Sequence, residues 1–106
     1  MKNLEQEMNR LENALQHGEV VLGMTGLAKL MLASRMRKLQ TVLLLSEMTG
    51  VLDEDKELKE KAENILKKFE EELKTLEDIE SMTNSRMEDI KSRKMFLNMA
   101  MGVSAN

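Results

Sequence analysis

The stretch MTGVLDED (residues 48–55) divides the chain into two parts of similar length. Gly50 is the residue type that most often ends a helix, because a residue without a Cβ adopts the left-handed conformation at little cost. Asp53 can accept hydrogen bonds from the first amides of a following helix, and its charge favours the positive end of that helix. Forty-nine residues precede Gly50 and fifty-six follow it. We therefore expect a helical hairpin that turns over 51–55.

The composition of the 106-residue chain favours helices on both sides of this turn. Charged residues make up 33% of the chain, and it contains no Pro, no Trp, no Tyr and two Phe. Leu, Met, Glu and Lys have high helix propensity, whereas sheets need β-branched and aromatic residues. The prediction is a single all-α domain over 1–106, folded as a long antiparallel helical hairpin. We expect helical segments at about 3–17, 19–49, 53–81 and 85–101, and a frayed tail at 102–106.

The second arm carries one apolar stripe on a highly charged helix. The stripe consists of Leu58, Ala62, Ile65, Leu66, Phe69, Leu73, Leu76 and Ile79. Steps of three and four residues keep these side chains on one helix face. The string SMTNS (81–85) then gathers small polar residues, and Ser85 with Glu88 has the spacing of a capping box. Two alternatives follow: a new helix over 85–101, or one helix that runs straight through.

The first arm opens with Leu4, Met8, Leu11 and Leu15, which have the alternating spacing of a coiled-coil seam. Gly18 could interrupt the helix, because Gly is about 1 kcal/mol less favourable than Ala inside a helix. The sequence leaves open whether 17–26 is a break. The stretch VVLGMTGLAKLMLA (20–33) follows, with Lys29 as its one charge. Its apolar residues cover an arc of roughly 200°, twice the usual width of about 100°.

One facing helix cannot cover so wide an apolar arc, and a large exposed apolar patch is typical of an association surface. Three coverings are conceivable. A second copy could form a dimeric four-helix bundle, and this covering is preferred. Alternatively, residues 3–17 and 85–101 could fold back over the arc in a compact monomer, or a different helical protein could occupy it.

We expect the association surface to draw on both arms. The candidate residues are Val20, Val21, Met24, Leu27, Leu30, Met31, Leu44 and Leu45 on the first arm, and Leu66, Phe69, Leu73 and Leu76 on the second. Eleven methionines give the chain flexible thioethers that adapt to partners, although Met also fills ordinary cores. Met95, Met99 and Met101 gather with Phe96 and Leu97 near the end of the chain.

The distribution of charge favours antiparallel arms. Residues 53–81 hold twelve acids and six bases, whereas residues 20–50 carry a net charge of +3. A turn at 50–53 brings the basic stretch 29–38 roughly opposite 66–75, where Glu70–Glu72 lie. An exposed ion pair contributes at most about 1 kcal/mol, so these charges choose the register more than they hold the fold. The basic strings SRMRK (34–38) and KSRK (91–94) have no aromatic residues between them, and the chain has a net charge of −3. Pairing with the acidic arm is therefore preferred over nucleic-acid binding.

The sequence shows no equipment for catalysis. The chain has no Cys, and His17 is its one histidine, so neither a metal site nor a nucleophile–base pair is evident. Acidic runs such as Glu70–Glu72 are typical of solvated faces, and no phosphate-binding glycine loop occurs. We expect a protein that is not an enzyme and that needs no cofactor and no metal.

These features predict a helical protein–protein interaction or assembly module, adaptor- or chaperone-like. Its expected partner is itself, as a homodimer or higher oligomer, or another helical protein. A polymerising structural subunit and a membrane-surface-binding amphipathic protein are the alternatives. Glu5, Glu7 and Glu12 near the start argue against a signal peptide, and no run of about 18 uncharged apolar residues could span a membrane. The predicted location is the cytoplasm.

Overall fold

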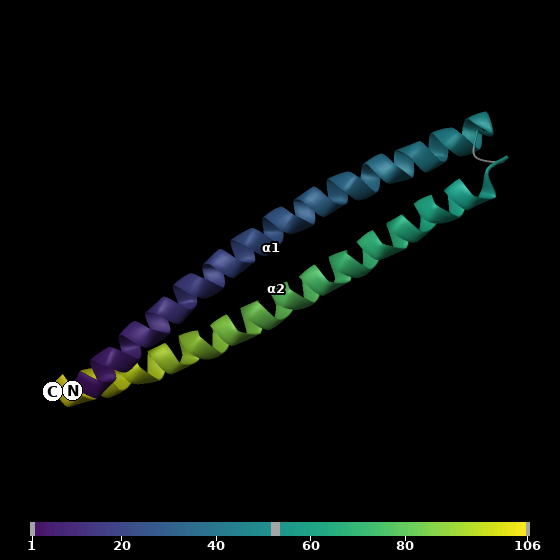
Figure 1. Cartoon of the computed structure of the whole chain (residues 1–106). Coiled ribbons are helices and arrows are strands. Elements are labelled where there is room, and N and C mark those ends of the chain that lie inside the picture. Colours follow the sequence, from purple (N-terminus) through teal and green to yellow (C-terminus); the bar gives the residue numbers. More distant parts are fainter. Residues whose placement is uncertain (1, 52–53, 106) are drawn as a thin grey trace. The chain divides into compact units, whose positions relative to one another are not determined.

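The computed structural model describes residues 2–51 and 54–105. It consists of two helices, α1 (Lys2–Thr49) and α2 (Lys56–Ala105), joined by the turn that follows Gly50 (Figure 1). No strand occurs in these two ranges. The predicted all-α antiparallel helical hairpin is confirmed.

Both helices run without interruption through the two candidate breaks, 17–26 and 81–85. α1 continues through His17 and Gly18, and α2 continues through 81–85, so Ser85 lies inside a helix and starts none. Because 3–17 and 20–33 belong to the same helix, residues 3–17 cannot fold back over 20–33, and the compact-monomer covering is wrong. The frayed tail expected at 102–106 is also wrong for 102–105, because α2 extends to Ala105. Asn106 lies outside the described residues.

The turn begins as expected and ends later than expected. Gly50 has a φ of 70°, the left-handed conformation predicted for a helix-ending glycine. α2 begins at Lys56 and not near 53, because Asp55 provides the cap: its Oδ1 accepts a hydrogen bond from the Leu58 amide at 3.1 Å. Asp53, which the sequence suggested for this role, lies outside the described residues. Either aspartate offers the same carboxylate, so residue type alone does not decide between them.

The packing divides the chain into two compact units, and each is described by itself. The terminal unit joins Met1–Thr25 with Ile79–Asn106, and the turn unit comprises Gly26–Asp78. In the turn unit Leu32 is buried, and the residues with reduced exposure recur at steps of three and four. Among them are Leu32, Met36, Leu39 and Leu43 on α1, and Ala62, Leu66, Phe69, Leu73 and Leu76 on α2. These rows are the inner faces of the two helices.

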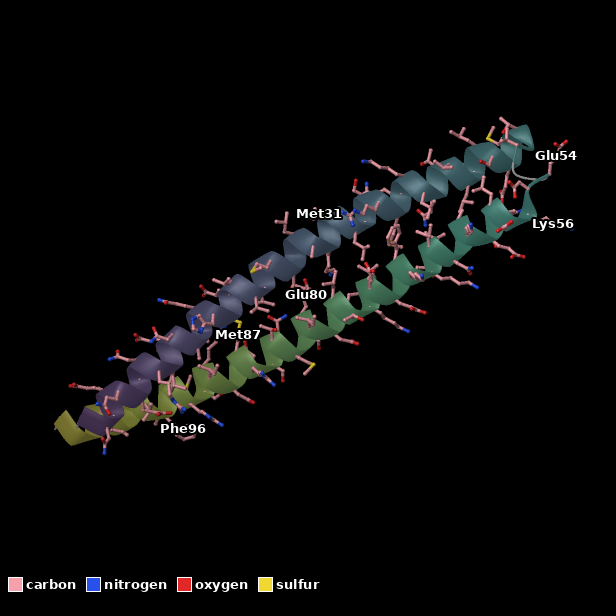
Figure 2. The ribbon with its side chains drawn as sticks, in the orientation of Figure 1. Met31, Glu54, Lys56, Glu80, Met87 and Phe96 are labelled. Carbon is pink, nitrogen blue, oxygen red and sulfur yellow. The ribbon has the colours of Figure 1, made fainter. Side chains whose placement is uncertain are left out.

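The terminal unit is built around a methionine that packs on a glycine. Leu11 and Met87 are buried, and Met87 is labelled in Figure 2. A Cβ added to Gly18 would lie 2.8 Å from both Cγ and Sδ of Met87, closer than atoms in contact can come. Lys94 Nζ lies 3.6 Å from Glu12 Oε1 and links the two helices at the rim of this packing. Gly18 thus leaves room for the Met87 side chain of α2 to pack against α1.

Candidate functional site

One side of α1 exposes a row of large apolar side chains, which we call the outer face. Along this uninterrupted helix, Val20, Met24, Leu27 and Met31 follow one another at steps of four, three and four, and Leu30 lies beside them. Such steps return to the same side of an α-helix. The five residues of the outer face are exposed by 58% (Val20), 67% (Met24), 61% (Leu27), 67% (Leu30) and 53% (Met31).

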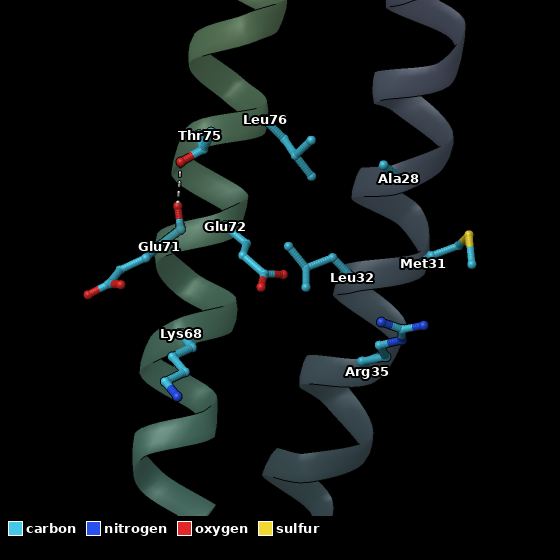
Figure 3. Close-up of a pocket in the computed structure, with 9 residues that line it drawn as sticks. All are labelled: Ala28, Met31, Leu32, Arg35, Lys68, Glu71, Glu72, Thr75 and Leu76. Atoms are coloured by element: carbon cyan, nitrogen blue, oxygen red, sulfur yellow. Dashed lines mark hydrogen bonds between the residues drawn. The ribbon is translucent and has the colours of Figure 1, made fainter.

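The outer face lies opposite the inner face. Leu32 is 5% exposed, although its neighbour Met31 is 53% exposed. Figure 3 shows the reason: Leu32 points toward α2 and Met31 points away from it. A helix that packs against one neighbour therefore hides one of these rows and leaves the other in water.

Two glycines of α1 have no explanation in the packing of the chain. Cβ atoms added to Gly23 and Gly26 would meet nothing within 4 Å, in contrast to the close contact at Gly18. A glycine inside a helix lowers stability by about 1 kcal/mol relative to alanine, and among the described residues no close contact at Gly23 or Gly26 requires a glycine. Gly23 stands seven residues before Leu30, so it lies at the edge of the outer face. A side chain from another molecule could therefore approach the α1 backbone closely at Gly23.

All eight first-arm residues predicted for association are exposed in the structure. Besides the outer face, Val21 is 39% exposed, and Leu44 and Leu45 lie exposed farther along α1. Exposure is what association requires, but it does not test the role. Val42 and Met48, which the prediction left out, are exposed on the same helix. Their positions follow from the unusually wide apolar distribution over 42–48, which one facing helix cannot cover.

The four second-arm residues occupy a different environment. Leu66, Phe69, Leu73 and Leu76 are half-buried on the inner face of α2 in the turn unit. Leu76 shares a groove of about 610 Å³ with Leu32 (Figure 3). These four side chains thus pack within the hairpin, and the structure does not join them to the outer face of α1.

The same groove confirms the expected register of charges in the turn unit. Arg35 of α1 lines it together with Glu71 and Glu72 of α2. The sequence predicted that 29–38 would lie opposite 66–75. Thr75 closes a local hydrogen bond within α2, from its Oγ1 to the carbonyl oxygen of Glu71 at 3.1 Å. Arg35, Glu71 and Glu72 are exposed at the rim of the groove, and Leu32 and Leu76 line its apolar part.

A second apolar cluster is exposed in the terminal unit. Met95, Phe96 and Met99 of α2 are exposed by 65%, 73% and 62%. Phe96 is labelled in Figure 2. The gathering of methionines with Phe96 near the end of the sequence was the signal for this cluster, although these residues were not among the predicted site residues. Phe96 is the most exposed of the three and offers the largest apolar side chain.

Comparison with known proteins assigns the chain to no family: no family model, no curated protein and no solved structure matches it. Within the described ranges, no group of three or more His, Cys, Asp or Glu side chains is placed to hold a metal ion. No helix in those ranges is long and apolar enough to cross a membrane.

Proposed function

We propose that this chain is a non-enzymatic helical association module, adaptor- or chaperone-like, that binds a second copy of itself through the outer face of α1. The observation that carries the proposal is the row of five large apolar side chains, each 53–67% exposed, on one side of a single helix. Scattered apolar residues on a protein surface need no explanation, whereas a contiguous row marks an interaction site.

The exposed apolar surface is of the size that a dimer needs. Fully burying a Val, Leu or Met side chain contributes about 1.5–3 kcal/mol, so a side chain that is still more than half exposed retains about 1–2 kcal/mol. Ten such side chains in a symmetric pair would contribute roughly 10–20 kcal/mol before costs. Association costs about 4–15 kcal/mol in lost freedom, and a micromolar dissociation constant corresponds to about 8 kcal/mol net. The apolar gain thus exceeds the cost over most of these ranges, and a dimer with a micromolar to submillimolar dissociation constant is the expected outcome.

Such a dimer would be a four-helix bundle. In each copy α1 would pack against its own α2 through the inner face and against the second α1 through the outer face. Isologous contacts of this kind, in which the same patch is used twice, close the assembly at two copies. The wide apolar distribution over 20–33 then serves two neighbours, and the inner rows follow the spacing typical of coiled coils.

The proposal is tested by measuring molar mass in solution against concentration. Size-exclusion chromatography with light scattering should give the 12.2 kDa monomer at low concentration and twice that mass above micromolar concentration. Leu30→Asp should raise the dimer dissociation constant at least about 100-fold, because it would bury an unpaired carboxylate. Gln40→Asp, a matched change at an exposed polar position of the same helix, should leave it within about twofold.

Three outcomes would contradict the proposal. The unaltered chain could stay a monomer at all concentrations and bind no hydrophobic dye. Leu30→Asp could associate like the parent chain, in which case the outer face is not the interface. Flotation of the chain with anionic liposomes, abolished by Leu30→Asp, would favour the membrane-surface alternative, in which Arg35, Arg37 and Lys38 contact lipid headgroups.

The cluster Met95, Phe96 and Met99 favours a second candidate function, a subunit that polymerises. A chain with two different apolar patches can pair each patch with the other on the next copy, and a heterologous contact that does not close grows without limit. The molar mass would then keep rising with concentration and would show no plateau at two copies. A plateau at the dimer would exclude this function.

A further inference from the structure

We infer that the two copies join with their α1 helices antiparallel, about a two-fold axis that passes beside Thr25 and Gly26. This inference rests on the proposed function, and it adds the direction and the register of the contact. Three observations carry it: the charges at the two ends of the outer face, the unfilled space at Gly23, and the way in which Gly18 receives a methionine in the terminal unit.

The outer face lies between segments of opposite charge. Residues 5–19 hold four acids and one base, whereas residues 34–38 hold three bases and no acid. Antiparallel packing sets the acidic segment of one copy beside the basic segment of the other, and parallel packing sets like charges side by side. Glu12 lies 3.6 Å from Lys94 of its own chain. Glu19 directly precedes Val20, so it is the acid nearest to the apolar row. Charges of this kind contribute little affinity but select the orientation of a contact.

The spacing of the outer face fixes the register. In an antiparallel pair of helices related by a two-fold axis, each row residue faces the residue of the second copy that lies equally far on the other side of the axis. Val20 then faces Met31 of the second copy, and Met24 faces its Leu27. This arrangement uses all four row residues twice, with the axis midway between residues 25 and 26.

Gly23 provides the seat for a side chain of the second copy. Residues 20, 23, 24 and 27 stand at i, i+3, i+4 and i+7, the four corners of a hole that accepts a knob from a facing helix. A Cβ at Gly23 would meet nothing within 4 Å, so this corner is open, and Leu27 of the second copy fits into it. The terminal unit shows the same device in use, where Gly18 admits the buried Met87. Gly26 is equally open but lies toward the inner side, away from this hole.

Two glycine variants test the seat. Gly23→Ala should raise the dimer dissociation constant about tenfold, because a methyl group would overfill the hole. Gly26→Ala, the matched control with the same gain in helix propensity, should change it by less than about twofold. Both variants should melt at or above the temperature of the parent chain when measured as monomers. Equal effects of the two variants on dimerisation would overturn the proposed seat.

Distances between spin labels test the direction. The chain has no cysteine, so Ser34→Cys and Asn13→Cys, both at exposed positions, each give one label site per copy. In the antiparallel dimer, the two labels at 34 should lie roughly 25 Å apart along the helix axis and those at 13 roughly 40 Å, at about 1.5 Å per residue. In a parallel dimer both pairs should lie at about 10 Å, the spacing of packed helices.

The outcomes separate this inference from the proposed function. A dimer whose mass is right but whose label pairs both lie near the short distance would overturn the antiparallel direction and leave the proposed function standing. A dimer with two label distances that fit neither arrangement would overturn it as well. A labelled chain that stays a monomer, like its unlabelled parent, would contradict the proposed function itself.

Discussion

The two helices of the turn unit differ in what they present to water. Both contribute an inner face to their common packing, with Leu32 on α1 and Leu76 on α2 lining one groove. On its exposed side α2 carries charged residues such as Glu70 and Lys74, which suit a helix with a single neighbour. α1 exposes Leu27, Leu30 and Met31 instead. α2 leaves Leu58 and Ile65 exposed in this unit, two helical turns apart, whereas α1 retains a contiguous second apolar row.

The largest expected effect comes from truncating a leucine on the inner row of α1, compared with the same change on its outer face. Leu32→Ala should lower the free energy of unfolding by about 2–5 kcal/mol, because it leaves a cavity at a buried position. Leu30→Ala removes the same atoms from a side chain that is 67% exposed and should cost less than about 1 kcal/mol. Urea denaturation of both variants, at a concentration where the chain is monomeric, measures the difference. Equal losses would mean that the two rows are not inner and outer.

The fold could be predicted from the sequence because its main signals are local. Gly50 ends a helix through its own backbone conformation, and the spacing of Leu66, Phe69 and Leu73 defines one face wherever that helix packs. That the helix continues through Gly18 could not be predicted. Helix propensity includes the cost of a glycine but not its contact with Met87, which lies sixty-nine positions away in the chain. Tertiary packing decides such cases.

The candidate site could be predicted only in part. The eight first-arm residues follow from the width of the apolar arc, since a wide arc must leave some residues exposed. The second-arm row was assigned to association from the same apolar character, yet Leu66 and Phe69 are half-buried in the hairpin. Packing on α1 takes up Leu66, Phe69, Leu73 and Leu76 of the α2 stripe and leaves Leu58, Ile65 and Ile79 exposed. The sequence does not state which apolar side chains that packing takes.

An effect of intermediate size should distinguish the glycines of α1. Gly18→Ala should lower the free energy of unfolding by about 1 kcal/mol, since the cost of displacing Met87 exceeds the gain in helix propensity. Gly26→Ala meets nothing within 4 Å and should raise stability by about 0.5–1 kcal/mol. Thermal unfolding of the two variants should therefore shift in opposite directions. A stabilised Gly18→Ala would show that α2 does not approach α1 closely at that point.

The smallest effect is expected on the charged side of α2, where Glu71→Lys reverses one exposed charge. Glu71 lies at the wall of the groove near Arg35, and exposed charges are screened by water and salt. The change in unfolding free energy should stay below about 1 kcal/mol and shrink further as the salt concentration rises. Chemical denaturation at low and high ionic strength measures it, and Glu60→Lys, which reverses another exposed charge of α2, is the matched control. If Glu71→Lys alone had a large effect that persisted in high salt, the exposed side of α2 would need a neighbour besides α1. Its acidic side would then bind a specific partner, and the contrast between the two helices would lie in the chemistry of their partners.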